Sequence, residues 1–91
     1  MNRTIITVIG KDTIGIIARI CTYLAEKNIN ILDISQTVVS GYFNMMMIVD
    51  ITTLEKPFGV LSDELASLGQ EKIGVQIKIQ KEEIFNLMHR I

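Results

Sequence analysis

The sequence has few of the residues that build disulfide-linked, metal-binding or membrane-spanning proteins. Its 91 residues include one cysteine (Cys21), one histidine (His89), one proline and no tryptophan. An intrachain disulfide is therefore excluded, and a zinc site made of several cysteines is not expected. No apolar run approaches the roughly 20 residues of a membrane span, and the start of the chain lacks the pattern of a signal peptide. We expect a cytoplasmic protein with no metal, no cofactor and no membrane contact.

An excess of charge of either sign is also missing. Nine lysines and arginines face ten aspartates and glutamates, so the net charge is −1. Nucleic-acid binders gain most of their affinity by neutralising phosphates with Lys and Arg, so a nucleic-acid partner is not expected. Hydrophobic residues make up 48% of the chain and charged residues 21%, which indicates a folded domain. We treat residues 1–91 as a single domain.

The first third of the chain predicts a strand, a turn and a helix. Residues 4–10 (TIITVIG) are β-branched and apolar on both faces, which is typical of a central strand. In the polar turn that follows, Asp12 or Thr13 can supply the N-cap of a helix. That helix is predicted from apolar residues at positions i, i+3, i+4 and i+7, namely Ile17, Ile20, Cys21 and Leu24.

The middle of the chain predicts a β-hairpin. Residues 29–39 and 42–52 are rich in β-branched and apolar residues, and Ser40-Gly41 between them is a turn signal. In the second of these strands, one face carries Phe43, Met45, Met47, Val49 and Ile51, and the other carries Met46 and Ile48.

The last part of the chain predicts a helix, a strand and a terminal helix. Pro57 suits the first turn of a helix that ends at Gly69, with a core stripe of Phe58, Leu61, Leu65 and Leu68. Residues 75–79 alternate between apolar and polar, as a half-buried strand does. Residues 82–91 predict a short terminal helix with an apolar stripe of Ile84, Leu87, Met88 and Ile91.

The predicted order is β-α-β-β-α-β followed by a helix. Right-handed crossovers place both internal helices on one face of a four-stranded antiparallel sheet, with strand order 4-1-3-2. This is a ferredoxin-like α+β sandwich with its core in residues 3–80. The two helices leave the other face of the sheet uncovered although it carries apolar residues, which usually marks an interface. We expect a dimer or higher oligomer in which residues 82–91 pack on a sheet of the same chain or of a partner.

Three segments resemble one family of small domains. Residues 7–16 (TVIGKDTIGI), 28–31 (NINI) and 33–37 (DISQT) are similar to ACT domains, which are amino-acid-sensing modules, and come close to the free-standing glycine-cleavage repressor type. The similarity covers roughly residues 3–80, and the terminal helix fits the free-standing subfamily. The family commonly has Arg-Pro before the turn glycine, where this chain has Thr13-Ile14.

The resemblance implies side-by-side dimers with small ligands bound between the first turn of one chain and the second strand of the other. Carried over by position, the ligand-binding residues are Asp12, Thr13, Ile14 and Gly15 from one chain, and Ile29 and Asn30 from its partner. Free amides in the first turn of a helix suit a carboxylate, and the Asp12 carboxylate suits an ammonium group. Asn30 adds a donor and an acceptor. This set fits an amino acid. The same residues also fit purely structural roles: a helix cap for Asp12, close packing for Gly15 and a strand start for Asn30.

The resemblance implies a non-enzymatic, allosteric regulatory module that binds an amino acid and modulates a partner in amino-acid metabolism. The alternative is an oligomerisation or protein-interaction adaptor without a ligand. Catalysis is not expected, because Cys21 lies on the apolar helix face, His89 lies near a helix end, and no acid pairs with a base. Tyr42-Phe43 faintly resembles an RNA-stacking motif, but that strand carries no Lys or Arg.

Overall fold

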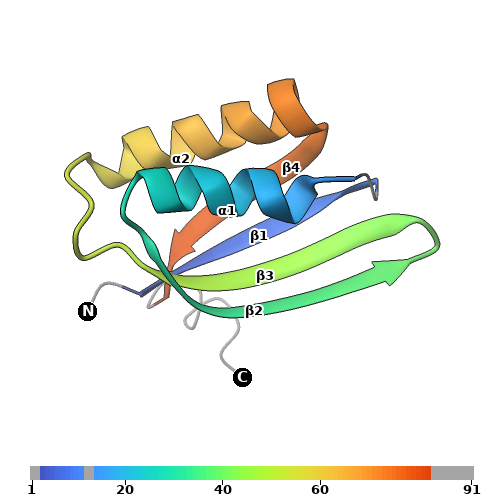
Figure 1. Ribbon diagram of the computed structural model, residues 1–91, viewed down its shortest axis with the longest axis horizontal. Coiled ribbons are helices and arrows are strands. Elements are labelled where there is room, and N and C mark those ends of the chain that lie inside the picture. Colours follow the sequence, from blue (N-terminus) through green and yellow to red (C-terminus); the bar gives the residue numbers. More distant parts are fainter. Residues whose placement is uncertain (1–2, 12–13, 83–91) are drawn as a thin grey trace.

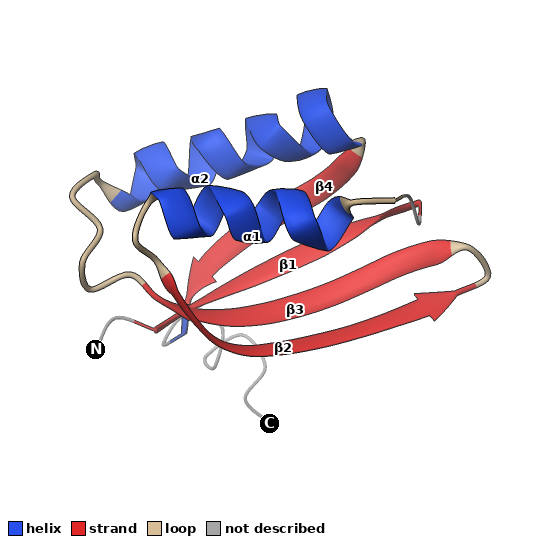
Figure 2. Ribbon diagram, viewed as in Figure 1, coloured by secondary structure: helices blue, strands red, loops and turns tan. Residues whose placement is uncertain are grey.

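Four antiparallel strands form one sheet, and two helices cover one of its faces (Figures 1 and 2). The computed structural model describes residues 3–11 and 14–82. Along the chain the elements are β1 (Arg3–Lys11), α1 (Ile16–Glu26), β2 (Asn30–Val39), β3 (Tyr42–Asp50), α2 (Phe58–Ser67) and β4 (Val75–Lys81). The sheet order is β2-β3-β1-β4, which is the predicted 4-1-3-2 read from the other edge. The ferredoxin-like prediction is confirmed, whereas the predicted terminal helix lies, beyond Glu82, outside the described residues.

The core lies between the sheet and the two helices. Alternation along β1 and β3 turns every second side chain toward the helices, and these side chains are buried; in β3 they include Met45 and Met47, which the sequence placed on one face of the strand. Each fully buried Ile, Leu, Val or Met contributes roughly 1.5–3 kcal/mol relative to its exposed state. The residues at the centre of this core are Ile6, Val8, Ile20, Leu24, Met47, Val49, Leu61 and Leu65.

The β2–β3 hairpin closes through the two residues that the sequence indicated. Ser40 has φ 52° and Gly41 has φ 81°, and Val39 pairs with Tyr42 directly across the turn. Two successive positive φ values define the tight turn whose twist matches that of the flanking strands. Near its start, β2 has a register shift between Ile31 and Asp33. The predicted antiparallel pairing of β2 with β3 continues on both sides of this irregularity.

Two predicted helix boundaries are wrong. Helix α1 begins at Ile16 with Gly15 in the N-cap position, so neither Asp12 nor Thr13 occupies that position. The second helix does not stop at Gly69 but continues as a π-helical segment, Leu68–Ile73, and ends at Gly74 with φ 85°. Gly69 serves packing instead, because a Cβ there would lie 2.6 Å from the Val75 carbonyl oxygen. The glycine that ends the helix is the one with the left-handed backbone.

A polar cluster joins the two helices at the C-terminal end of α1. The Tyr23 hydroxyl donates to Glu64 Oε1 at 2.6 Å, and Lys56 Nζ lies 2.9 Å from Glu64 Oε2. Lys27 Nζ lies 4.0 Å from the same carboxylate. The hydrogen bonds from Tyr23 and then Lys56 lower the pKa of Glu64. Burial, and then the contact with Glu64, raises the pKa of Tyr23 well above its ordinary value.

Candidate ligand site

The first turn of α1 presents open backbone amides. Gly15 precedes the helix with φ 88°, and within the described part of the chain no side chain caps this end. The first N–H groups of an α-helix have no intrahelical acceptor, and they carry partial positive charge. A Cβ placed on Gly15 would meet no atom within 4 Å, so this glycine does not serve close packing. Its conformation favours glycine, and the space beside it is open.

The loop that leads into this turn is only partly described. Asp12 and Thr13 lie outside the described residues. The Ile14 side chain is fully exposed, and Lys11, at the end of β1, is exposed too. An exposed apolar side chain beside open amides is available for contact with a ligand or with another chain.

At the other predicted half of the site, the end of α1 and Thr53 fix the start of β2. The Ile29 amide donates to Leu24 O at 2.9 Å, and Thr53 Oγ1 donates to the Asn28 carbonyl at 2.7 Å. The Ile29 side chain is buried in the core, so only its backbone can face a ligand. Asn30 is exposed and opens β2 opposite Asp50 of β3.

Within one chain these two halves lie at opposite ends of α1. Gly15 precedes the helix, and Asn30 follows it (Figure 1). Eleven helical residues at ~1.5 Å each span about 16 Å, which is longer than an amino acid. A single protomer therefore does not bring the predicted ligand residues together, and a ligand that contacts both halves requires a second chain.

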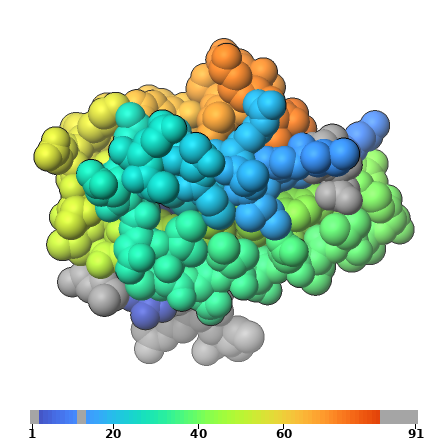
Figure 3. All heavy atoms as spheres, viewed as in Figure 1, coloured from blue at the N-terminus to red at the C-terminus, as the bar shows by residue number. Residues whose placement is uncertain are grey.

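The edge strand β2 is unusually open. In the described sheet it pairs with β3 alone, and nearly every one of its residues is exposed. On its helix-facing side, Ile34 is 39% and Val38 53% exposed. Figure 3 shows the hairpin surface, in green, lying uncovered beside α1. A long edge with free backbone groups and exposed apolar side chains is a template for pairing with another strand. We call Ile34 and Val38, with the outer edge of β2, the β2 shelf.

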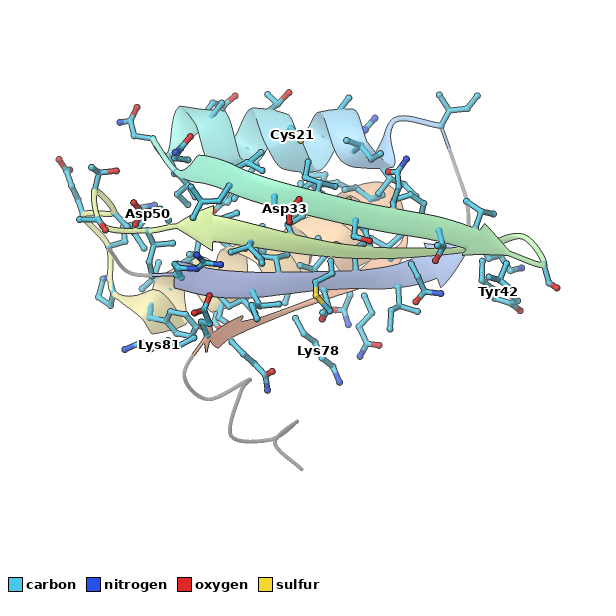
Figure 4. The ribbon with its side chains drawn as sticks, turned by 90° about the horizontal axis from the view of Figure 1, so that it is seen from below. Cys21, Asp33, Tyr42, Asp50, Lys78 and Lys81 are labelled. Atoms are coloured by element: carbon cyan, nitrogen blue, oxygen red, sulfur yellow. The ribbon has the colours of Figure 1, made fainter. Side chains whose placement is uncertain are left out.

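The described residues give little support to RNA binding, catalysis or metal binding. Phe43 is 4% exposed and points into the core, so it cannot stack on a base. Cys21 is partly buried against the core, as predicted. Asp33 and Asp50, which Figure 4 labels, accept hydrogen bonds from nearby residues of the chain, Ile34 N and Thr52 N. Over residues 3–11 and 14–82, no group of three His, Cys, Asp or Glu side chains could hold a metal ion. None of the helices in this part of the chain is long and apolar enough to cross a membrane.

Sequence reasoning missed the β2 shelf and the role of Thr53. The apolar residues Ile34 and Val38 in a strand predicted at the edge of the sheet were the available signal for the shelf, since an edge strand has a neighbour on one side only. No local pattern pointed to Thr53, because its partner, Asn28, is 25 residues away.

Comparisons with known proteins agree with this geometry. A UPF0237 protein of Bifidobacterium longum is 60% identical over 91 residues, which are 100% of both chains. The structure of an ACT domain protein from Streptococcus pneumoniae has a TM-score of 0.81 at 43% identity, over 92% of this chain and 93% of that one. The regulatory subunit of aspartate kinase from Thermus thermophilus, in its ligand-free form, has a TM-score of 0.61 at 25% identity, over 87% of this chain and 50% of that one. The family model for the ACT domain matches residues 2–80, and the chain belongs to the ACT domain family.

Proposed function

We propose that this protein is a non-enzymatic regulatory module that binds an amino acid at a homodimer interface and modulates a partner protein of amino-acid metabolism. The observation that carries the proposal is the open first turn of α1: no described side chain caps it, and the space beside Gly15 is free. Membership of the ACT domain family supports this reading of the turn. The similarity to the regulatory subunit of aspartate kinase supports the choice of partner class.

The proposed dimer is built along the β2 shelf. Pairing the edge strands of two chains would satisfy their free backbone groups and bury Ile34 and Val38 of both. In a two-fold dimer the same surface is used twice, so there are two equivalent sites. Each site combines the turn before α1 of one chain with Asn30 of the other chain. The separation of Gly15 and Asn30 within one chain supports a site shared between two.

The proposed ligand is a zwitterion. Its carboxylate accepts hydrogen bonds from the amides of the first turn, and its ammonium group binds the Asp12 carboxylate. Asn30 of the partner offers a donor and an acceptor to the same ligand. Small ligands gain at most about 1.5 kcal/mol per heavy atom and usually less, so we expect a Kd on the order of micromolar to millimolar.

A thermal-shift screen with the twenty amino acids at millimolar concentration tests the proposal. An external dye reports unfolding, because the chain has no tryptophan. We expect one or two amino acids to raise Tm by several degrees, since a ligand at 100 times its Kd adds ~2.7 kcal/mol. Asp12→Ala and Asn30→Ala should remove the shift. The matched controls Asp63→Ala and Asn44→Ala change exposed residues of the same types elsewhere and should keep it.

A ligand-independent adaptor is the second candidate, favoured by the exposed apolar side chains of the β2 shelf. Such a protein would form the oligomer but respond to no amino acid. If light scattering shows a stable dimer while none of the twenty changes Tm, the sensor is refuted and the adaptor is supported. If both Asp12→Ala and Asn30→Ala keep a selective shift, the ligand binds elsewhere and the site is wrong.

A further inference from the structure

The sheet has a second edge, which the proposed dimer does not use. In the described part of the chain, β4 pairs with β1 alone. In an antiparallel pair, the N–H and C=O groups of alternate residues point away from the neighbouring strand, so those of β4 point outward. All seven residues of β4 pair with β1 without a register shift, whereas β2 has one. The outer side of β4 therefore presents a regular row of groups that another strand could bond.

A groove runs along this edge beside α2 (Figure 1). Its volume is about 380 Å³, and residues 76–80 of β4 form one wall. Ser62 and Ala66 of α2 form the other wall, together with Gln70 of the π-helical segment that continues α2. Ser62 and Ala66 are four residues apart, so they lie on the same face of the helix, and both have small side chains. They leave room for larger side chains of an added strand.

The other face of β4 carries a positive charge. Because Ile77 and Ile79 are buried against the helices, Lys78 between them points to the opposite face of the sheet. Lys78 is exposed, and no ion pair joins it to another residue in the described part of the chain. Figure 4 labels it on the outer strand of the sheet. Side chains of a strand added at this edge would lie directly beside it, where an acidic side chain is favoured.

A second copy of the chain fits this edge poorly. Two β4 strands related by a two-fold axis run antiparallel, and the register that pairs their whole length places the two Lys78 side chains opposite each other. Like charges in that position destabilise a strand pair, and a lysine on an edge strand is a common means of preventing self-pairing. The edge therefore favours a different segment with an acidic residue at that position.

We propose that the β4 edge binds an extended, acidic segment of a partner protein, which adds to the sheet as a fifth strand. The segment alternates apolar side chains, which enter the groove beside Ser62 and Ala66, with acidic side chains on the face of Lys78. Backbone hydrogen bonds supply affinity in strand addition, and alternate side chains supply specificity. This inference rests on the proposed function for the existence of a partner protein, but it does not depend on amino-acid binding.

Hydrogen exchange followed by NMR on the full chain tests whether the edge is free. We expect the outward amides of β4 to exchange much faster than the amides that bond to β1. The probe is a blocked peptide of alternating valine and glutamate, as long as β4, and it should slow the exchange of the outward amides. Outward amides that are already protected in the protein alone, or that the peptide leaves unprotected, overturn the proposal.

A charge exchange at Lys78 tests the specificity of the edge. In titrations followed by NMR, a valine–lysine peptide should bind about fivefold more weakly than the valine–glutamate peptide, because an ion pair is replaced by a like-charge contact. Lys78→Glu should reverse this preference. The matched control Lys11→Glu changes the same charge beyond the residues of β1 that pair with β4, and it should keep the preference. Equal binding of the two peptides, or equal effects of the two variants, would refute the role of Lys78.

A second matched pair tests the groove. Ala66→Leu fills part of it and should weaken binding of the valine–glutamate peptide, whereas Ala25→Leu on an exposed part of α1 should not. Unchanged binding to Ala66→Leu would place the peptide elsewhere and overturn the proposal. These measurements use no amino acid. A peptide that fails to bind while an amino acid raises Tm rejects the β4 edge alone, and a peptide that binds while no amino acid raises Tm supports the edge and rejects the sensor.

Discussion

Replacing Gly10 by alanine should destabilise the fold although the change adds only one methyl group. Gly10 lies in β1 opposite Val75 of β4, and an added Cβ would lie 2.7 Å from Val75 Cγ1 and 3.0 Å from Val75 Cα. The side-chain contact can relax by rotation, but the contact with Cα requires the two strands to separate. Overpacking of this kind typically costs about 1–3 kcal/mol. For a domain of this size that lowers Tm by roughly 4–8 °C per kcal/mol.

The matched control for Gly10→Ala is Gly59→Ala. A Cβ on Gly59, in the first turn of α2, would meet no atom within 4 Å, and alanine has the higher helix propensity. This change should stabilise the fold by about 0.5 kcal/mol. Urea unfolding followed by far-ultraviolet circular dichroism measures both variants. If Gly10→Ala is as stable as the parent, the close approach of β1 and β4 at Val75 is wrong.

Two further predictions concern stability. The pKa of Glu64 is lower in the folded state than in the unfolded state, so the unfolded chain takes up more protons as the pH falls, and the stability that this group contributes is lost below its ordinary pKa of 4.5. The urea midpoint should therefore fall less steeply between pH 7 and pH 3 in Glu64→Gln than in the parent protein. Parallel curves for the two proteins would contradict this role of Glu64. Gly74→Ala should lower the free energy of unfolding, measured with urea, by about 1–2 kcal/mol. This cost comes from backbone strain alone, because φ is 85° at Gly74 and no neighbouring atom is near enough to clash with an added Cβ. An unchanged urea midpoint would contradict the left-handed backbone at the end of the helix.

The order of elements and the sheet could be predicted because they depend on patterns within short segments. Alternation in residues 75–79 and the turn at Ser40-Gly41 carry their information locally, and both were confirmed. The end of the second helix could not be predicted in this way. Gly69 and Gly74 are equally good terminators in the sequence, and only the approach of Gly69 to Val75 and Ile77 shows which one is needed for packing.

The candidate site was harder to predict, because its parts are far apart in one chain. The residues around Gly15 and Asn30 could be named from a resemblance, but the open space beside Gly15 and the burial of Ile29 depend on the folded core. Ile34 and Val38 of the β2 shelf are visible in the sequence as apolar residues of an edge strand, but only the folded chain shows that both stay exposed. Sequence reasoning therefore located the segments of the site, and the geometry decides which of their atoms are free to bind.

The proposed shared site has a quantitative consequence for assembly. A ligand that binds only the dimer must strengthen dimerisation by the same factor by which dimerisation strengthens its binding. At 100 times its Kd, each occupied site adds ~2.7 kcal/mol, which is a factor of about 100. Two equivalent sites in a two-fold dimer then tighten the dimer Kd by about 10⁴. Sedimentation across a dilution series, with and without the amino acid that raises Tm, measures this factor. A factor that rises in proportion to the free ligand concentration, rather than to its square, indicates one site per dimer. No shift indicates a ligand held within one chain, which would refute the shared site.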